Sequence, residues 1–456
     1  MSTRIMPPAG APRALAAAQL SNSIGDGMYY TCSALYFTQV VGLPPTHLGL
    51  GLTAAWAVGS LAGVPLGHLA DRRGPRATAV LLTLATAVVV ASFLVVRSFV
   101  PFLIVSCLYS TAQSGLAAVR QALLAGLVEP ADRTGVLAHM QSTLNAGLAV
   151  GAALGGLALS DGTRAAFLAV FALDALCFLA GALILLRLPT VRATHRRTDD
   201  EPRLAVLRDR PYAVVTLLNT VLLLRLPLLS LAIPLWTASR FPGLTWLSSA
   251  LFVLNTVAVM LFQVRTAHAV TDLGSASRTV RRAGVLLLVS CAVFAVSAAR
   301  LPAWAAVAVL IAGATLQVVG EMKQSAGSWQ IGFDLAPPHQ IGQYQGFFGT
   351  GVAVARTLGP LLVTALLMTW GVPGWLLLGG LFLGAGCAMG PAVRWAERNR
   401  PGAGAPSSSA RSQRRVLSPA PSGSFRSAPF AGLAAVPQRA LSSRRSSTAP
   451  PDVSSP

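Results

Sequence analysis

Long apolar stretches separated by short polar ones run along most of the chain. Stretches of about 20 apolar residues are long enough to cross a bilayer as helices, whereas membrane β-strands are shorter and alternate in polarity. The pattern therefore predicts an all-α polytopic membrane protein with twelve transmembrane helices. The predicted spans are residues 14–41, 47–70, 77–96, 101–128, 135–160, 164–188, 212–239, 245–267, 280–299, 302–323, 341–370 and 373–395.

The longest internal polar stretch, residues 189–211, follows the sixth predicted span and is expected to be a cytoplasmic linker. It separates an N-terminal half, residues 14–188, from a C-terminal half, residues 212–395, each with six predicted helices. A short repeat supports the division, because a leucine, a proline and a glycine five residues after the proline recur in residues 127–135 and 335–342. One large class of secondary transporters is built from two such parallel halves.

Composition and charge agree with a membrane protein and indicate its orientation. Of the 456 residues, 54% are hydrophobic and 11% charged, whereas about a quarter of a soluble domain is charged. The net charge is +20, and 28 of the 35 Lys and Arg residues lie in residues 1–13, in every second connection with the span ends beside it, and in the tail. The alternate connections hold only Arg97, Arg164, Arg240 and Arg300. Because cytoplasmic loops carry the excess of Lys and Arg, we expect a multi-pass protein of the cell membrane with both termini in the cytoplasm.

Residues 396–456 form a basic tail that contains 14 Ser and 9 Pro from Pro401 onward. Such a composition cannot bury a hydrophobic core. We therefore expect a disordered cytoplasmic tail.

The sequence holds no pattern typical of an enzyme, a metal site or a nucleic-acid-binding surface. Basic residues do not gather with aromatic residues on one amphipathic face, as nucleic-acid binding requires. The five cysteines lie singly in apolar stretches, and no phosphate-binding loop is present. We predict no catalytic residue, metal, cofactor, ATP or nucleic-acid partner. We expect the protein to be a monomer whose partners are a small-molecule substrate, protons and the lipid bilayer.

The connection after the second predicted span reads GHLADRRGPR over residues 67–76. A glycine, an aspartate four residues later and then Arg-x-Gly resemble the loop signature of the major facilitator superfamily. The resemblance covers residues 14–395 and implies the twelve-helix fold of that superfamily. It also implies a gating loop formed by Gly67, Asp71, Arg72, Gly74 and Arg76. In this loop Asp71 would meet the positive N-terminus of a facing helix or a basic side chain; the alternative is that the loop charges only fix the topology.

The fifth predicted span carries glycines at helical spacing over residues 145–156, with Ala152 among them. This stretch is similar to the antiporter signature of the superfamily's drug/proton exchangers, in which a proline stands at the position of Ala152. Residues 22–27 likewise resemble the first span of bacterial efflux members. The resemblance implies that this glycine face packs against another helix, seals the protein against leakage, or does both. Its residues are Gly147, Gly151, Gly155 and Gly156.

Six ionisable residues inside the predicted spans are the candidates for binding a proton or a substrate. They are Asp26, Arg120, Asp174, Arg225, Glu321 and Arg356. Each costs about 2.5–3.5 kcal/mol at the centre of a membrane helix and therefore needs a reason to be there. Asp26 is the favoured proton-binding residue, because it lies near mid-membrane between two glycines that would let the helix backbone open.

The sequence leaves the roles of the other five residues open. Glu321 lies near the cytoplasmic end if its helix stops at Lys323, and deeper if the helix continues to about Gly332. Asp174 is explained equally well by transport and by a helix-to-helix hydrogen bond, and Arg120 can instead extend toward the membrane surface. Arg225 and Arg356 each need a carboxylate partner or an anionic substrate, but the pairing cannot be deduced. Two prolines, Pro227 and Pro234, predict a bend in the seventh span.

These patterns favour a secondary transporter that works by alternating access around a cavity at mid-membrane between the two halves. Proton-coupled export of a small organic molecule is the favoured function. Uptake of a small solute by symport, or its passage through a facilitator, is the alternative. A membrane sensor or enzyme without transport is the least supported class, and the substrate is not identified.

Overall fold

A computed structural model describes residues 9–161, 163–190, 204–241, 246–299 and 301–400. Within these residues the chain forms helices joined by short turns, without a β-strand. The predicted disordered tail beyond residue 400 and most of the predicted linker lie outside the described residues.

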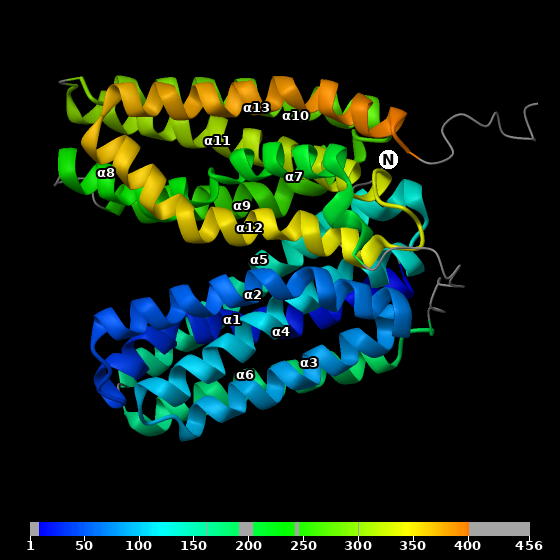
Figure 1. Cartoon of the computed structure of the whole chain (residues 1–456). Helices are drawn as coiled ribbons and strands as arrows, with labels where there is room; N and C mark the ends of the chain where they lie inside the picture. Colours follow the sequence, from blue (N-terminus) through cyan, green and yellow to red (C-terminus); the bar gives the residue numbers. More distant parts are fainter. Residues whose placement is uncertain (1–8, 162, 191–203, 242–245, 300, 401–456) are drawn as a thin grey trace, which may run out of the picture. The chain divides into compact units, whose positions relative to one another are not determined.

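The first half begins with a long helix near the N-terminus (Figure 1). Its helices are α1 Ala11–Leu35, continued by a π-helical turn Tyr36–Val40, and α2 Pro45–Arg73, α3 Pro75–Ser92, α4 Phe99–Leu127, α5 Arg133–Asp161 and α6 Arg164–Leu186. Proline stands in the first turn of α2 and α3, where its missing N–H has no helical partner to lose. Gly74 joins these two helices at φ 96°, a conformation that glycine adopts without steric cost.

The second half follows a short 3₁₀ helix, Ala205–Arg208. Its helices are α7 Arg210–Leu223, α8 Ile233–Arg240, α9 Trp246–His268, α10 Leu273–Val296, α11 Ala303–Asp334, α12 Ile341–Thr364, continued by a π-helical turn Ala365–Thr369, and α13 Val372–Arg398. The seventh span is broken at the predicted place. There α7 ends before Pro227, a π-helical turn Leu228–Ala232 follows, and α8 completes the span.

The described residues contain twelve helical segments of membrane length when α7 and α8 are counted as one span. Eleven of them are also apolar enough to cross a membrane. The exception is α1, whose polar residues Gln19, Asn22 and Asp26 lower its hydropathy. The prediction of an all-α protein with twelve transmembrane helices in two halves is confirmed.

Helix packing repeats between the two halves. In the first half, α1 packs on α5 and α6, α2 packs on α4, and α3 packs on α4 and α6. The second half has the same pattern, since α7 packs on α12 and α13, α9 on α11, and α10 on α11 and α13. Figure 1 shows α1–α6 (blue to teal) and α7–α13 (green to orange) as two groups. Contacts between the groups are reciprocal as well, because α2 meets α12 and α5 meets α9.

Two span boundaries differ from the prediction. The tenth span does not stop near Lys323, because α11 continues to Asp334, which is the longer of the two alternatives for Glu321. The ninth span starts at Leu273 rather than 280, and Asp272 caps it by accepting a hydrogen bond from the backbone N–H of Ser275 at 2.9 Å. This bond lowers the pKa of Asp272. In both cases polar residues extend a helix beyond the apolar stretch that the sequence shows.

Candidate functional site

A cavity of about 390 Å³ lies between the two halves and is lined by both of them. The first half contributes residues of α1, α2, α4 and α5, and the second half contributes residues of α7, α11 and α12. Small-molecule sites in proteins typically have volumes of about 300–1,000 Å³. The cavity therefore has the size of a site for a small solute.

Asp26 of α1 lines this cavity. It accepts a hydrogen bond from the hydroxyl of Tyr109 at 2.8 Å and another from the side-chain amide of Gln113 at 2.8 Å, both from α4. The helix is continuous here, so the expectation that the neighbouring glycines open the backbone is wrong. The glycines instead allow close packing: a Cβ at Gly27 would lie 2.5 Å from the carbonyl oxygen of Leu148 on α5.

Two of the predicted arginines also line the cavity. Arg120 of α4 donates a hydrogen bond to the side-chain oxygen of Gln19 on α1. Arg356 of α12 lies over the ring of Trp56 on α2, with 5.5 Å between the guanidinium carbon and the ring centroid. Neither arginine has a carboxylate within 4 Å among the described residues.

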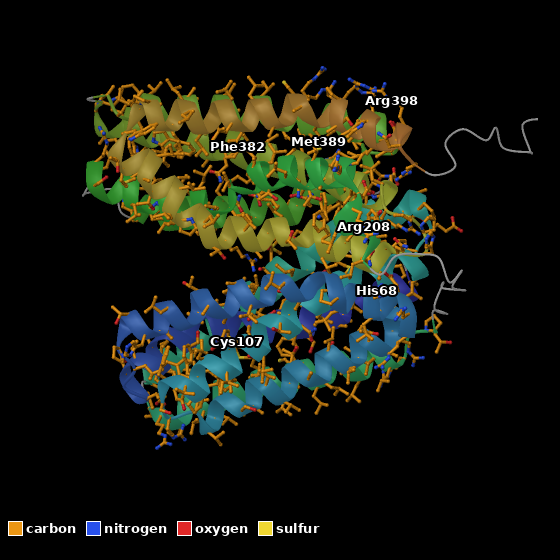
Figure 2. The ribbon with its side chains drawn as sticks, in the orientation of Figure 1. His68, Cys107, Arg208, Phe382, Met389 and Arg398 are labelled. Carbon is orange, nitrogen blue, oxygen red and sulfur yellow. The ribbon has the colours of Figure 1, made fainter. Side chains whose placement is uncertain are left out.

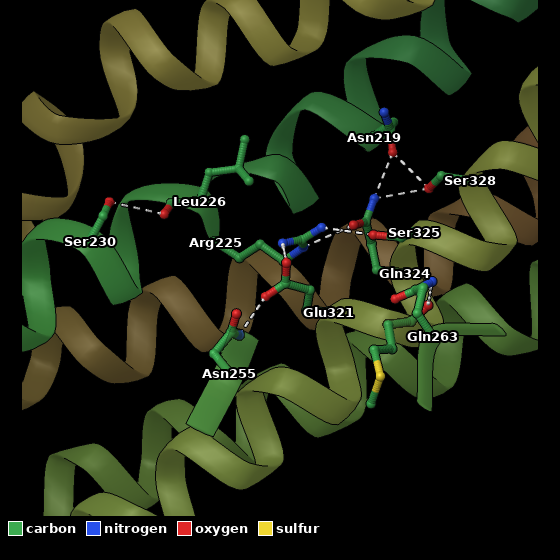
Figure 3. Close-up of polar contacts among 11 residues, drawn as sticks. Asn219, Arg225, Leu226, Ser230, Asn255, Gln263, Glu321, Gln324, Ser325 and Ser328 are labelled. Carbon is green, nitrogen blue, oxygen red and sulfur yellow. Dashed lines mark hydrogen bonds and ion pairs between the residues drawn. The ribbon is translucent and has the colours of Figure 1, made fainter. Parts of the chain in front are cut away.

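Arg225 and Glu321 pair with each other away from the cavity lining. The distance between Arg225 Nη1 and Glu321 Oε1 is 2.9 Å, and their side chains are 5% and 23% exposed. Figure 3 shows the surrounding hydrogen bonds: Asn255 donates to Glu321 at 3.0 Å, and Arg225 donates to Gln324 at 2.9 Å and to Ser325 at 3.0 Å. The pair fastens the break between α7 and α8 to α9 and α11.

Gln324 connects this ion pair to the cavity. Its amide nitrogen donates to Asn219 at 2.9 Å and to Ser328 at 3.0 Å (Figure 3). All three side chains line the cavity. These residues and the partners of Asp26 are uncharged, so they are not among the six candidates predicted from intramembrane charges. Amide and hydroxyl side chains inside apolar spans are the signal that would have found them.

Asp174 lies outside the cavity lining. It is fully buried on α6, where its carboxylate faces Gly25 of α1. Neither carboxylate oxygen has a hydrogen-bond partner among the described residues. The proposed helix-to-helix hydrogen bond is therefore not formed.

The loop that resembles the superfamily signature crosses between the halves. Asp71 accepts hydrogen bonds from the backbone N–H groups of Gly342 at 2.8 Å and Gln343 at 2.9 Å, in the first turn of α12. A carboxylate at this position satisfies N–H groups that have no partner inside the helix and matches the positive end of the helix dipole. The backbones of Gly67 and Gly342 touch directly, so a side chain at either position would collide with the other helix.

Other members of the predicted gating loop contact their own half. Arg76 donates to the carbonyl oxygens of Leu185, at 3.4 Å, and Leu186, at the C-terminal end of α6. Arg72 is exposed. Of the predicted gating residues, Asp71 and Gly67 therefore make the contacts with α12, and the neighbouring His68 adds a hydrogen-bond contact between its Nδ1 and the side-chain nitrogen of Gln343 at 3.3 Å.

A second contact between the halves lies at the same end of the helices as Asp71, and here α5 of the first half meets α9 and α11 of the second. Thr134, in the first turn of α5, donates a hydrogen bond to the side-chain oxygen of Gln330 on α11. A Cβ at the neighbouring Gly135 would lie 3.1 Å from Cε1 of His268 on α9. We call this end, where the 3₁₀ helix Ala205–Arg208 also lies, the linker end. His68 and Arg208 are labelled there in Figure 2.

The glycine face of α5 packs on α1. A Cβ would lie 2.7 Å from Ser23 at Gly147 and 3.0 Å from Thr31 at Gly155, and a Cβ at Gly151 would collide with the α1 backbone. By contrast, a Cβ at Gly156 would meet nothing within 4 Å. Three of the four predicted glycines thus lie at this helix contact.

Comparison with known proteins decides the family. A sequence model of the Major Facilitator Superfamily matches residues 15–360. The chain belongs to this superfamily. No curated protein matches it in sequence.

Solved structures of superfamily fold are similar over nearly their whole length. The human organic anion transporter MFSD10 (TETRAN) is 18% identical with a TM-score of 0.63, and the match covers 83% of this chain and 98% of that one. A bacterial homologue of the iron transporter ferroportin in an outward-facing state is 13% identical with a TM-score of 0.66, covering 85% and 99%. The fucose:proton symporter FucP of E. coli is 12% identical with a TM-score of 0.63, covering 84% and 98%. At these identities the similarity establishes the superfamily fold, and this chain is a multi-pass membrane protein of a transporter family.

Proposed function

We propose that this superfamily member is a proton-coupled secondary transporter that moves a small organic molecule by alternating access. Asp26 is the residue that binds and releases the proton, and the cavity between the halves binds the substrate. No catalytic step is part of this function. One observation carries the proposal: a carboxylate on a central helix lines a small-molecule-sized cavity that both halves share.

The proton site has the chemistry that coupling requires. A carboxyl group that borders both a hydrogen-bonding network and a cavity can exchange a proton with the cavity and sense its contents. Tyr109 and Gln113 hold Asp26 by donating to the same oxygen, Oδ1, and no described residue donates a hydrogen bond to Oδ2. That second oxygen is the one we assign to the proton.

The linker end is the gate of this proposal. The described hydrogen bonds between the halves lie in the linker-end portion of the helices. They include those that α12 donates to Asp71 and the one that Thr134 donates to Gln330. Rocking of one half against the other has to break these contacts to open that end. Because basic residues concentrate in the connections at this end and in both terminal segments, we place the linker end and both termini in the cytoplasm of a cell-membrane protein.

Two directions of coupling have support. Export by proton exchange is favoured by the similarity of residues 145–156 to the antiporter signature. Cotransport of substrate and proton is favoured by the excess of arginine over carboxylate around the cavity. The relative direction of the proton flux and the substrate flux decides between them: opposite directions indicate exchange, and the same direction indicates cotransport.

Proteoliposomes with an imposed pH gradient and a trapped pH-sensitive dye test the proposal. The test compounds form matched sets, in which a phenyl, naphthyl or short alkyl skeleton carries a sulfonate, an amide or an amine. We expect at least one compound to move in response to the gradient and to shift the internal pH in proportion to its flux. The control variant Asp161→Asn removes an exposed carboxylate outside the cavity and should transport normally. If the flux of every transported compound is independent of the pH gradient, the protein is a facilitator instead.

A further inference from the structure

The charged side chains that line the cavity are two arginines and one aspartate among the described residues. Arg120 belongs to the first half and Arg356 to the second, so each half contributes one positive charge. Asp26 is the single negative charge in the lining. The cavity therefore carries a net charge of about +1 when Asp26 is ionised, and about +2 when it is protonated.

Neither arginine forms an ion pair within 4 Å among the described residues. Arg120 donates to the uncharged oxygen of Gln19, and Arg356 stacks over the face of Trp56. Stacking over an aromatic ring orients a guanidinium group and leaves its N–H edges available for another partner. Glu321 is already engaged by Arg225. Because Asp26 can offset only one of these two positive charges, the cavity favours an anion from outside the chain.

The rest of the lining fits the remainder of such a ligand. Trp56 and Trp329 come from opposite halves and supply flat apolar walls. Gln345 of α12 also lines the cavity, where its side-chain amide nitrogen is buried and lacks a hydrogen-bond partner. A buried donor without a partner is unfavourable, and an acceptor on a bound ligand would give this nitrogen a partner. The lining thus presents two cations, one free donor and apolar walls.

We propose that the substrate is a small organic anion with a flat apolar body, and that its acidic group binds between Arg120 and Arg356 together with a proton on Asp26. This inference rests on the proposed proton-coupled transport and selects cotransport from its two directions.

The sign of the coupling follows from the charges. An ionised Asp26 repels an anion in the same cavity, and protonation removes that repulsion. Each ligand therefore strengthens the binding of the other by the same factor. Two unit charges about 10 Å apart at an effective dielectric constant of about 20 give about a tenfold effect. A cationic substrate would compete with the proton instead, as an exchanger requires.

The surroundings of Asp26 contain few other groups that titrate. Tyr109 and Arg120 face it from α4, Arg356 faces it from α12, and Tyr29 and Tyr30 lie near it on α1 itself. Asp174 of α6 is the other carboxyl group that interacts with it. The glycine face of α5 brings no charge to this contact. Because Asp174 is fully buried outside the cavity lining, the anion affinity should follow the protonation of Asp26.

Binding of probes that share a shape and differ in charge tests this inference on the purified full chain. The probes are naphthalene-2-sulfonate, the corresponding sulfonamide and 2-naphthylmethylammonium, with phenyl and short alkyl versions of each. Sulfonates keep their charge across the pH range, so a pH effect reports on the protein. On the skeleton that binds, we expect the sulfonate to bind more tightly than the sulfonamide and the amine. Its affinity should be about tenfold higher at acidic than at alkaline pH.

Variants separate the roles of the two charges. Asp26→Asn should bind the sulfonate tightly at both pH values, because the amide imitates the protonated carboxyl. Arg356→Gln should weaken sulfonate binding about tenfold or more, and Arg356→Lys should restore part of it. Arg278→Gln is the matched control, since Arg278 is exposed on α10 and does not line the cavity.

Tighter binding of the amines, sulfonate affinity that falls on acidification, no sulfonate binding, or unchanged affinity in Arg356→Gln would each overturn the inference. Proton-driven transport of an amine or amide in the proteoliposomes would overturn the anionic substrate and leave the proposed transporter intact. Loss of gradient dependence for all compounds would overturn the proposed function itself.

Discussion

The ion pair between Arg225 and Glu321 gives the sharpest prediction about stability. Replacing Glu321 by leucine removes the carboxylate and leaves a guanidinium group whose side chain is 5% exposed. Loss of one partner from a buried ion pair typically costs about 3–5 kcal/mol, because the remaining charge stays buried without compensation. Glu321 is 23% exposed and Arg225 keeps its bonds to Gln324 and Ser325, so we expect the lower end, about 3 kcal/mol.

A double variant separates the loss of the pair from the loss of shape. Arg225→Met combined with Glu321→Leu removes both charges and retains similar side-chain volumes. The free energy of unfolding of this double variant should therefore lie within about 1 kcal/mol of that of the unchanged protein. Arg278→Met, at an exposed arginine, should change the free energy of unfolding by less than about 0.5 kcal/mol. The free energies are measured by denaturing titrations in mixed micelles, followed by intrinsic tryptophan fluorescence.

Two results would refute this reasoning. If Glu321→Leu alone is as stable as the unchanged protein, the pair does not fasten the α7–α8 break. If the double variant is as unstable as the single one, packing rather than charge explains the loss. A normally stable Glu321→Leu protein without proton-driven transport would instead assign Glu321, rather than Asp26, to coupling.

Further predictions concern the gate, the buried acid, the tail and the cysteines. Asp71→Asn should weaken the two charge-assisted hydrogen bonds that α12 donates to residue 71, so the population with an open linker end should rise about 10-fold or more. Thiol or spin labels at the linker end measure that opening, and unchanged accessibility would contradict the gate. Asp174→Asn should retain proton-driven transport at equal abundance, because its carboxyl does not line the cavity; loss of that transport would assign it a coupling role. Truncation after Arg400 removes no described helix and should preserve flux per molecule, whereas a large loss at equal membrane abundance would reveal a function of the tail. Membrane-impermeant thiol reagents should label Cys107 and Cys291 poorly in intact cells, and rapid labelling of either would contradict the assigned spans.

The sequence was sufficient for the architecture because membrane-spanning helices must satisfy their backbone hydrogen bonds internally and expose apolar side chains to lipid. That requirement leaves an unambiguous pattern, and the proline pair in the seventh span marks its break. It also explains the two wrong boundaries. Residues such as Gln324 and Ser328 extend α11 while facing protein rather than lipid, so a hydropathy pattern ends too early there.

The site was only partly predictable, because pairing depends on which helix faces share a contact. Six ionisable residues stood out, yet nothing in the chain order indicates that Arg225 meets Glu321 while Arg356 meets the ring of Trp56. The glycines beside Asp26 suggested an open backbone, and the structure uses them for close helix packing. Spatial neighbours, rather than residue types, separate the stabilising ion pair from the charges around the cavity.

Exchange measurements on Asp26→Asn in proteoliposomes test the central claim most directly. Accumulation driven by a pH gradient is compared with counterflow, in which labelled substrate exchanges against unlabelled substrate without a gradient. Because the amide cannot take up a proton in the working range but preserves the shape of the site, we predict that accumulation is lost while counterflow continues. Asp26→Glu, which restores a carboxyl group, should recover part of the accumulation. Full gradient-driven accumulation by Asp26→Asn would contradict the account.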